Sequence, residues 1–243
     1  MKASGPNSQR GSEGGPGSSD PGQYRFTAAT VQDLLAVAYN VKYFQISSPT
    51  PLDRHTVDLV AKIPPGATKE QFRVMLQNLL IERFAMKMHV EKKDFPAYEL
   101  VIAKTGAKPK DGVPAGPRKF VGADLMELEP NRPGMLSNNS VSGDFMLVRF
   151  RARQQTFAAF ASMLRPSDGL TVVDRTGLDG KYDFNLEFTQ DPPGRTPDAL
   201  SDPPVAPSLF TAVQEQLGLQ LVRSRVPFDA VIVESFSPEP SAN

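Results

Sequence analysis

Apolar and polar residues follow two different periods along the chain, and these periods predict strands and helices in a definite order. Residues 24–28 alternate as in a strand, and residues 30–40 carry apolar side chains at helical spacing, with Thr30 as N-cap and Asp33 three positions later. Strands are expected at residues 43–47 and 56–63. Thr68 then opens the longest amphipathic helix, which extends to about Phe84.

The first half ends in two further apolar runs, which are predicted to be strands. They cover residues 86–92 and 97–104, and the short segment Asp94-Phe95-Pro96 separates them. Because so few residues lie between them, an antiparallel hairpin is the expected pairing.

The second half repeats this order of elements about 125 residues later. The expected elements are a strand at 145–152, a helix at 156–164, strands at 170–174 and 181–188, a helix at 208–217, and a final hairpin of 220–225 with 228–236. We therefore predict an internal duplication.

The predicted fold class is α+β, built from two tandem copies of a small β-α-β-β-α-β-β module with mostly antiparallel sheets and helices packed on one face. The expected boundaries are a disordered tail at 1–23, a first module at 24–104, a Pro/Gly-rich connection at 105–143, a second module at 144–237 with a Pro-rich insertion at 191–207, and a tail at 238–243. The length of 243 residues suits two small cores or one two-lobed domain.

The composition excludes several classes of function. Lys plus Arg and Asp plus Glu both number 27, so no excess of positive charge predicts a nucleic acid partner. The absence of cysteine excludes disulfides, thiolate metal sites and a cysteine nucleophile. No run approaches the roughly 18 apolar residues that span a bilayer, and the N-terminus lacks the apolar core of a signal peptide.

Candidate catalytic chemistry is sparse. His55 and His89 are expected in separate strands, and neither has a second ligand at helical spacing, so no metal site is predicted. No glycine-rich nucleotide loop or Walker motif occurs, and the one glycine- and serine-rich segment, residues 15–19, is expected in the disordered tail and provides no nucleophile elbow. We expect no cofactor and no enzymatic activity.

An aspartate- and glycine-rich segment between two expected strands could suggest a calcium loop, but EF-hand spacing is absent. We interpret the segment as a structural turn, in which Gly177 and Gly180 supply positive φ angles, Leu178 enters the core and the aspartates accept hydrogen bonds from amides. Its residues are Asp174, Gly177, Leu178, Gly180, Tyr182 and Asp183.

A basic stripe is the one candidate binding feature. Arg149, Arg151 and Arg153 recur at period two, so they project from one face of the expected strand. The stripe is either a solvated sheet face or a surface that grips an acidic partner or a phosphate.

The segment 172–184 (Val-Val-Asp-Arg-Thr-Gly-Leu-Asp-Gly-Lys-Tyr-Asp-Phe) resembles the hallmark of an uncharacterised family abundant in soil Acidobacteria, a domain of unknown function. Segments 32–47, 58–64, 69–84 and 208–219 fit the same pattern, so the resemblance covers residues 24–236. The order of elements is more weakly similar to the short N-terminal domain of secretins and TonB-dependent receptors, which is a protein-contact module.

The resemblance implies an exported protein of the periplasm or cell envelope, with another envelope protein as partner, for example a membrane metallopeptidase or a receptor. Members of the family usually begin with an export signal and a strand of the Phe-Glu-Val-Ala-Ser type. This chain starts just past that strand, so we expect either a misplaced start or a trimmed chain. Val57 stands where the family usually has Tyr, which makes the first module the more diverged copy.

Two functions remain open on this basis. The first is a non-enzymatic binding or protein-interaction module that uses exposed sheet edges or the groove between modules. The second is a small-molecule or envelope-fragment sensor or carrier, with the ligand between the modules and the insertion at 191–207 as a lid.

Overall fold

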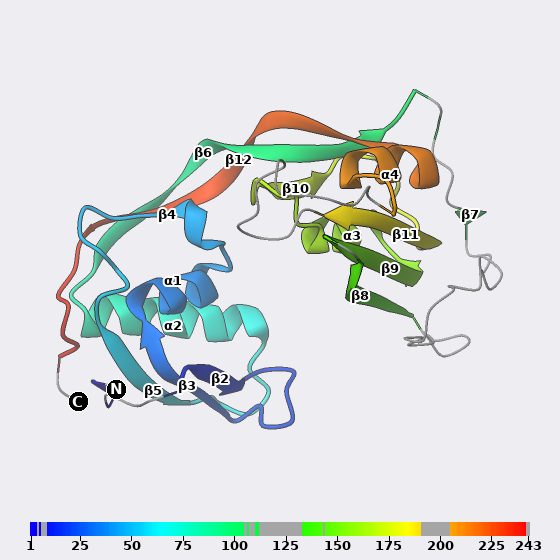
Figure 1. The fold of residues 1–243 in the computed structure, drawn as a ribbon. Coiled ribbons are helices and arrows are strands. Elements are labelled where there is room, and N and C mark those ends of the chain that lie inside the picture. The colour runs from blue at the N-terminus through cyan, green and yellow to red at the C-terminus, as the bar shows by residue number, and fades with distance from the viewer. Residues whose placement is uncertain are drawn as a thin grey trace. The chain divides into compact units, whose positions relative to one another are not determined.

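The structure, a computed structural model, consists of two compact units. It describes residues 1–3, 5, 9–104, 106, 110–111, 133–142, 144–190 and 205–241. Unit 1 comprises Met1–Asp94 with Pro227–Asn243, and unit 2 comprises Phe95–Val226. Helices and mostly antiparallel sheets confirm the predicted α+β class (Figure 1).

The elements follow one another in an order close to the predicted one. They are β1 (Lys2–Ala3), β2 (Gly11–Gly14), β3 (Gln23–Thr30), α1 (Val31–Tyr39), a 3-10 helix (Tyr43–Gln45), β4 (Ile46–Ser47), β5 (Thr56–Lys62), α2 (Lys69–Arg83), β6 (Lys87–Ile102), β7 (Lys110–Asp111), β8 (Gly134–Ser142), β9 (Phe145–Gln155), α3 (Phe157–Met163), β10 (Thr171–Asp174), β11 (Tyr182–Gln190), α4 (Leu209–Leu217) and β12 (Leu219–Ser235). The segment predicted as a strand at 43–47 is therefore mostly a 3-10 turn, because Lys42 N–H bonds to the side chain of Gln45 and Gln45 N–H bonds back to the Lys42 carbonyl.

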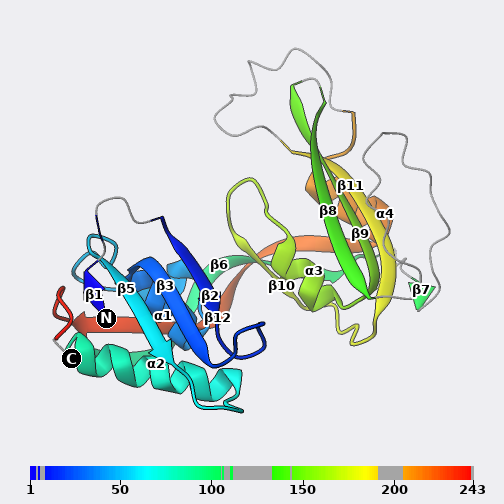
Figure 2. The same cartoon turned by 90° about the horizontal axis from the view of Figure 1, so that it is seen from below.

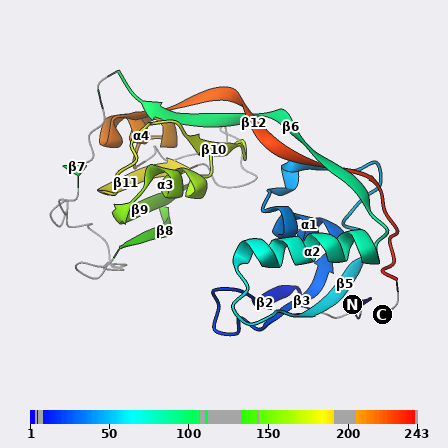
Figure 3. The same ribbon diagram turned by 180° about the vertical axis from the view of Figure 1, so that it is seen from behind.

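Unit 1 is built on a sheet of order β1-β5-β3-β2. Helices α1 and α2 lie together on one face of this sheet (Figure 3). Their apolar stripes bury Leu34, Leu35, Leu76 and Leu80, as the helical spacing in the sequence predicts. The helices and the sheet therefore share one hydrophobic core.

The prediction of a disordered tail at residues 1–23 is wrong for β1 and β2. Residues 11–14 pair antiparallel with residues 24–27 of β3, and residues 2–3 pair with β5. The composition indicated disorder because residues 1–23 have few apolar side chains to bury. Main-chain hydrogen bonds hold β1 and β2 in place, because they pair with β5 and β3, whose own side chains are buried in the core.

Unit 2 contains a sheet of order β7-β11-β9-β8 and an aromatic core. Phe157 of α3 stacks on Phe184 of β11 with ring centroids 5.2 Å apart, and Phe160 meets the same ring edge-on at 4.9 Å. These rings join α3 to the face of the sheet that carries Phe150 and Leu186.

Strand β8 lies inside the segment 105–143, which was predicted to be an irregular connection. That prediction is wrong for residues 134–142, which pair with β9 along their whole length. Ser and Asn dominate the strand, so the sequence carries no apolar alternation to reveal it. Most of the rest of the connection, together with residues 191–204 of the insertion and 242–243 of the tail, lies outside the described residues.

Both predicted hairpins are wrong, because β6 and β12 are continuous strands. They are neighbours in a sheet of order β10-β6-β12-β4 and run side by side (Figure 1). Asp94-Phe95-Pro96 contains none of the Gly or Asn residues that a tight hairpin turn requires, so the chain continues extended. Each strand consequently contributes one end to each unit.

The strand pairing and the core residues show that β6 and β12 each belong to both units. In unit 1, β4 pairs in parallel with residues 231–232 of β12, and Val231 and Val233 lie in the core. In unit 2, β10 pairs in parallel with residues 97–100 of β6, and Leu100 lies in the core. The units therefore do not coincide with the predicted modules, because each is completed by a segment from the other half of the chain.

The two units share one detailed feature, a β-bulge before the first helix. Ala28 and Gln154 both have φ of 51°. The Ala28 amide donates to Asp58 Oδ1 at 3.0 Å, and the Gln154 amide donates to Asp183 Oδ1 at 2.8 Å. The bulges agree with the predicted duplication, which stays a prediction.

We predict that Val231→Ala lowers the free energy of unfolding by about 2 kcal/mol, because the substitution removes the two methyl groups of Val231, which are fully buried in the core of unit 1. Val222→Ala, on the half-exposed part of the same strand, is the control and should change the free energy of unfolding by less than about 0.5 kcal/mol. Chemical denaturation measures both variants. Equal effects would contradict the placement of β12 in the core of unit 1.

We predict that Asp183→Ala lowers the free energy of unfolding by about 1–3 kcal/mol, because the buried Asp183 carboxylate is the acceptor of the Gln154 amide at the β-bulge. Asp179→Ala removes an exposed aspartate from the same turn and is the matched control, with an expected change below about 0.5 kcal/mol. Thermal unfolding compares the two, and a control as destabilised as Asp183→Ala would show that the bulge contact is unimportant.

Candidate functional site

A pocket of about 460 Å³ lies within unit 1. Residues within 10–16 line one part of it, β3 contributes Tyr24 and Phe26, and α1 contributes Asp33, with the C-cap residue Asn40 just after the helix. Tyr43 and the first turns of α2 complete the lining. The pocket is therefore built from segments that the sheet and the two helices of unit 1 bring together.

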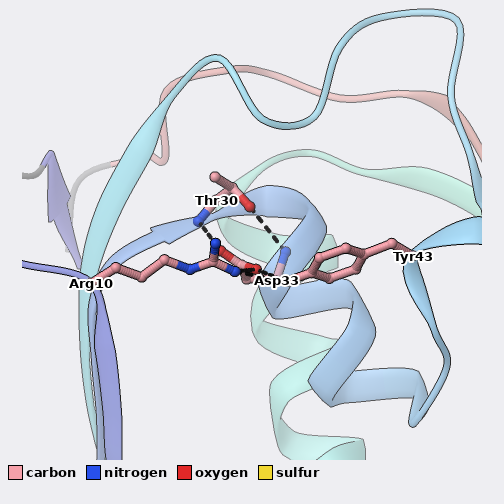
Figure 4. A network of polar contacts seen from close by, with 4 residues as sticks. All are labelled: Arg10, Thr30, Asp33 and Tyr43. Atoms are coloured by element: carbon pink, nitrogen blue, oxygen red, sulfur yellow. Dashed lines mark hydrogen bonds and ion pairs between the residues drawn. The ribbon is translucent and has the colours of Figure 1, made fainter. Parts of the chain in front are cut away.

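A buried carboxylate, Asp33, organises the polar side of this pocket (Figure 4). Asp33 is 3% exposed and accepts hydrogen bonds from the Arg10 guanidinium and from the Tyr43 hydroxyl. Its second oxygen accepts from the Thr30 amide at 2.9 Å, and its own amide donates to Thr30 Oγ1 at 3.1 Å. The carboxylate thus caps α1 and joins three other segments of the chain.

The pKa of Tyr43 is raised above its ordinary value, first by the hydrogen bond to Asp33 and then by burial. Arg10 opposes this shift, since Arg10 Nη2 lies 2.6 Å from the Tyr43 hydroxyl oxygen. Burial also raises the pKa of Tyr24, another residue of the lining. Both phenols therefore stay protonated at neutral pH, and the Tyr43 hydroxyl donates a hydrogen bond to Asp33.

Two further cations line the pocket, and each is held by its neighbours. Arg73 Nη2 donates to Asn40 Oδ1 at 3.0 Å, and Arg73 Nη1 lies 3.8 Å from Glu70. A β-carbon added to Gly17 would lie 3.1 Å from Lys69 Cε, so the loop packs against the lysine stem. The pocket therefore presents three cationic side chains and one carboxylate.

Unit 2 lacks the equivalent carboxylate. Thr156 caps α3 as Thr30 caps α1, and its hydroxyl accepts from the amide three residues later at 3.2 Å. The residue three positions after the N-cap is Ala159 in α3, whereas it is Asp33 in α1. The chemistry of the pocket is thus a property of unit 1 alone.

The predicted basic stripe lies on β9 in unit 2. Arg149 Nε donates to Glu187 Oε2 of β11 at 2.6 Å, so Arg149 is engaged in a cross-strand ion pair. All three arginines are partly buried, and they face residues 134–138 of the edge strand β8. Their role in partner binding stays a prediction.

The predicted turn has most of the expected geometry. Asp174 Oδ1 accepts from the Thr176 amide at 2.9 Å, Gly177 has φ of 69°, and Leu178 packs against the core of unit 2. The prediction of a positive φ at Gly180 is wrong, because Gly180 is not among the glycines with positive φ. A β-carbon there would lie 2.8 Å from the Tyr182 hydroxyl, so glycine is required for space.

The remaining residues of the turn segment also have structural places. Tyr182 is buried and its ring stacks on Phe157, and Asp183 closes the β-bulge described above. None of these residues lines the pocket of unit 1.

Sequence reasoning did not identify the pocket. It placed Asp33 at the third position of α1 but read it only as a cap, and it assigned Arg10 to a disordered tail. No motif joins Arg10, Asp33 and Tyr43, since their meeting depends on the pairing of β2 with β3. The position of Asp33, three residues after the N-cap Thr30, was the one usable signal.

The described residues contain neither a metal-ligand group nor a membrane-spanning helix. No group of three or more His, Asp or Glu side chains placed to hold a metal ion occurs there. Within the same residues, no helix combines the length and apolar character needed to cross a membrane.

We predict that Asp33→Ala destabilises the protein by about 1–3 kcal/mol, because the Thr30 amide and Arg10 lose their acceptor. The pKa of Tyr43 should fall toward its ordinary value, since the hydrogen bond that favours the protonated phenol is gone. Ultraviolet titration of the phenols, with Tyr43→Phe to assign the Tyr43 component, measures the shift. An unchanged Tyr43 titration would contradict the contact.

Comparison with known proteins identifies a family. A family model described as "Protein of unknown function (DUF3738)" matches residues 32–236. No curated protein and no solved structure matches the chain. The match confirms the predicted membership of a family of unknown function, whereas the source in Acidobacteria and the likeness to secretin and TonB-receptor domains stay predictions. The chain belongs to the DUF3738 family of proteins of unknown function.

Proposed function

We propose that this protein is a non-enzymatic binding module of the cell envelope, and that it engages another envelope protein by adding a strand of that partner to β8. The observation that carries the proposal is the character of this edge strand. Nine residues, 134–142, pair with β9 on one side, and no strand among the described residues pairs with the other side (Figure 2).

The composition of β8 supports this use. Exposed edges in monomeric proteins usually carry charges, prolines or bulges that prevent pairing with another chain. Strand β8 contains no Lys, Arg, Asp, Glu or Pro, and its register with β9 is regular throughout. An extended peptide could therefore add main-chain hydrogen bonds along the whole strand.

Side chains near the edge suggest how a partner would be selected. Val141 is 83% exposed and offers an apolar contact. Arg149, Arg151 and Arg153 lie on the neighbouring strand, on the face that they share with Leu136 and Asn138. Acidic residues in the added strand would suit this face, so a membrane metallopeptidase or receptor with an acidic extended segment is the proposed kind of partner.

The alternative is a small-molecule sensor or carrier. The specific observation in its favour is the pocket of about 460 Å³ in unit 1, a size typical of ligand sites. The lid expected at 191–207 falls almost entirely outside the described residues.

Photo-crosslinking in the cell envelope tests strand addition. A photoreactive phenylalanine analogue replaces Val141 on β8, or Val90, which is exposed on β6 and serves as the matched control. We expect the probe at position 141 to capture one envelope protein and the probe at position 90 not to capture it. Equal capture from both positions would contradict the proposal.

Hydrogen exchange with a peptide from the captured segment locates the contact. The amides of residues 134–142 should exchange at least about tenfold more slowly in the complex, because each outward amide gains a partner. Val141→Lys should weaken peptide binding about tenfold and Val90→Lys should leave it unchanged. Protection confined to other strands would exclude β8 as the binding edge.

A further inference from the structure

We propose that the pocket of unit 1 binds a small aromatic carboxylate, with its ring against Tyr24 and Phe72 and its carboxylate between Lys69 and Arg73. This site is independent of strand addition at β8, since its lining residues all belong to unit 1.

The apolar wall is formed by aromatic rings. Tyr24 and Phe72 are 6% and 9% exposed, with ring centroids 4.9 Å apart and an interplanar angle of 63°. A β-carbon on Gly15 would lie 3.4 Å from Tyr24 Cδ2, so this glycine lies beside the ring. Aromatic ligands prefer such edge-to-face and stacked neighbours, and the space of about 460 Å³ accommodates one.

The charges of the lining favour an anion. Arg10, Lys69 and Arg73 face the pocket with Asp33 as the one acidic lining residue. Asp33 is already compensated by Arg10, Tyr43 and the Thr30 amide. Two cationic side chains therefore remain for a ligand, and a carboxylate would complement them.

Arg73 is positioned before any ligand arrives. Its guanidinium is held by Asn40, which ends α1 with φ of 53° and bonds through its amide to carbonyls of the last turn. Glu70 lies 3.8 Å away, and its side chain is 77% exposed, so solvent screens this attraction. A guanidinium has five N–H donors in a planar fork, which matches the two oxygens of a carboxylate.

Lys69 lies one helical turn before Arg73, so the two side chains share one side of α2. The Gly17 loop packs on its stem and restricts its ammonium group. None of the ion pairs among the described residues involves Lys69.

Titration of the complete protein with four probes, followed by amide NMR, tests the proposal. Benzoate is the expected ligand, benzamide has its shape without the charge, cyclohexanecarboxylate has the charge without the aromatic ring, and inorganic phosphate has charge alone. We expect benzoate to shift amides of residues 12–16, 36–40 and 69–73, and to bind at least about tenfold more tightly than the other three.

Variants separate the pocket from non-specific attraction. Lys69→Gln and Arg73→Gln should each weaken benzoate binding about tenfold, whereas Lys62→Gln, at an exposed lysine of β5 outside the pocket, should not. Thermal unfolding verifies that each variant is folded. Absence of benzoate-induced shifts at 20 mM, equal binding of phosphate or of benzamide, or an equal effect of Lys62→Gln would overturn the proposal.

Discussion

Strands β6 and β12 each place their two ends in different hydrophobic cores. Val231 and Val233 of β12 are buried in unit 1, while Leu219 and Leu221 of the same strand are buried in unit 2. Strand β6 divides in the same manner, with Met86 just before it in one core and Leu100 in the other. Neither unit can complete its core without the other half of the chain, so folding of the two halves must be coupled.

Each unit carries one candidate binding feature. In unit 1 residues of the N-terminal segment, α1 and α2 line a pocket beside the compensated carboxylate of Asp33. In unit 2 the strand β8 ends the sheet with uncharged residues and an open edge. These features differ between the units, since α3 has Ala159 at its third position where α1 has Asp33, and the edge strand β2 of unit 1 has only four residues.

The sequence was sufficient to predict the helices, the main strands and the fold class. A half-buried strand has an apolar residue at every second position and a half-buried helix has one about every 3.6 positions, and both spacings can be recognised in the sequence. It could not predict that β6 and β12 continue through Pro96 and Pro227, since that outcome depends on which core receives each strand end. Strand β8 and the segment around Arg10 were missed for a related reason, because main-chain pairing with a neighbour holds them and few apolar side chains reveal them. The pocket was missed as a consequence, although Asp33 itself was seen as a helix cap.

Disulfide trapping tests the exchange of strand ends most directly, because the natural chain contains no cysteine. Ser47 and Ile232 are register partners in the parallel pair of β4 with β12, at a spacing that permits a disulfide. Cysteines at these two positions are predicted to form an intramolecular disulfide rapidly and nearly completely under mild oxidation. Cysteines at 222 and 231, which would oppose each other in a hairpin but lie nine residues apart along the continuous strand β12, should not. Rapid closure of the 222–231 pair, with none for 47–232, would show that β12 folds back as a hairpin and would contradict the account.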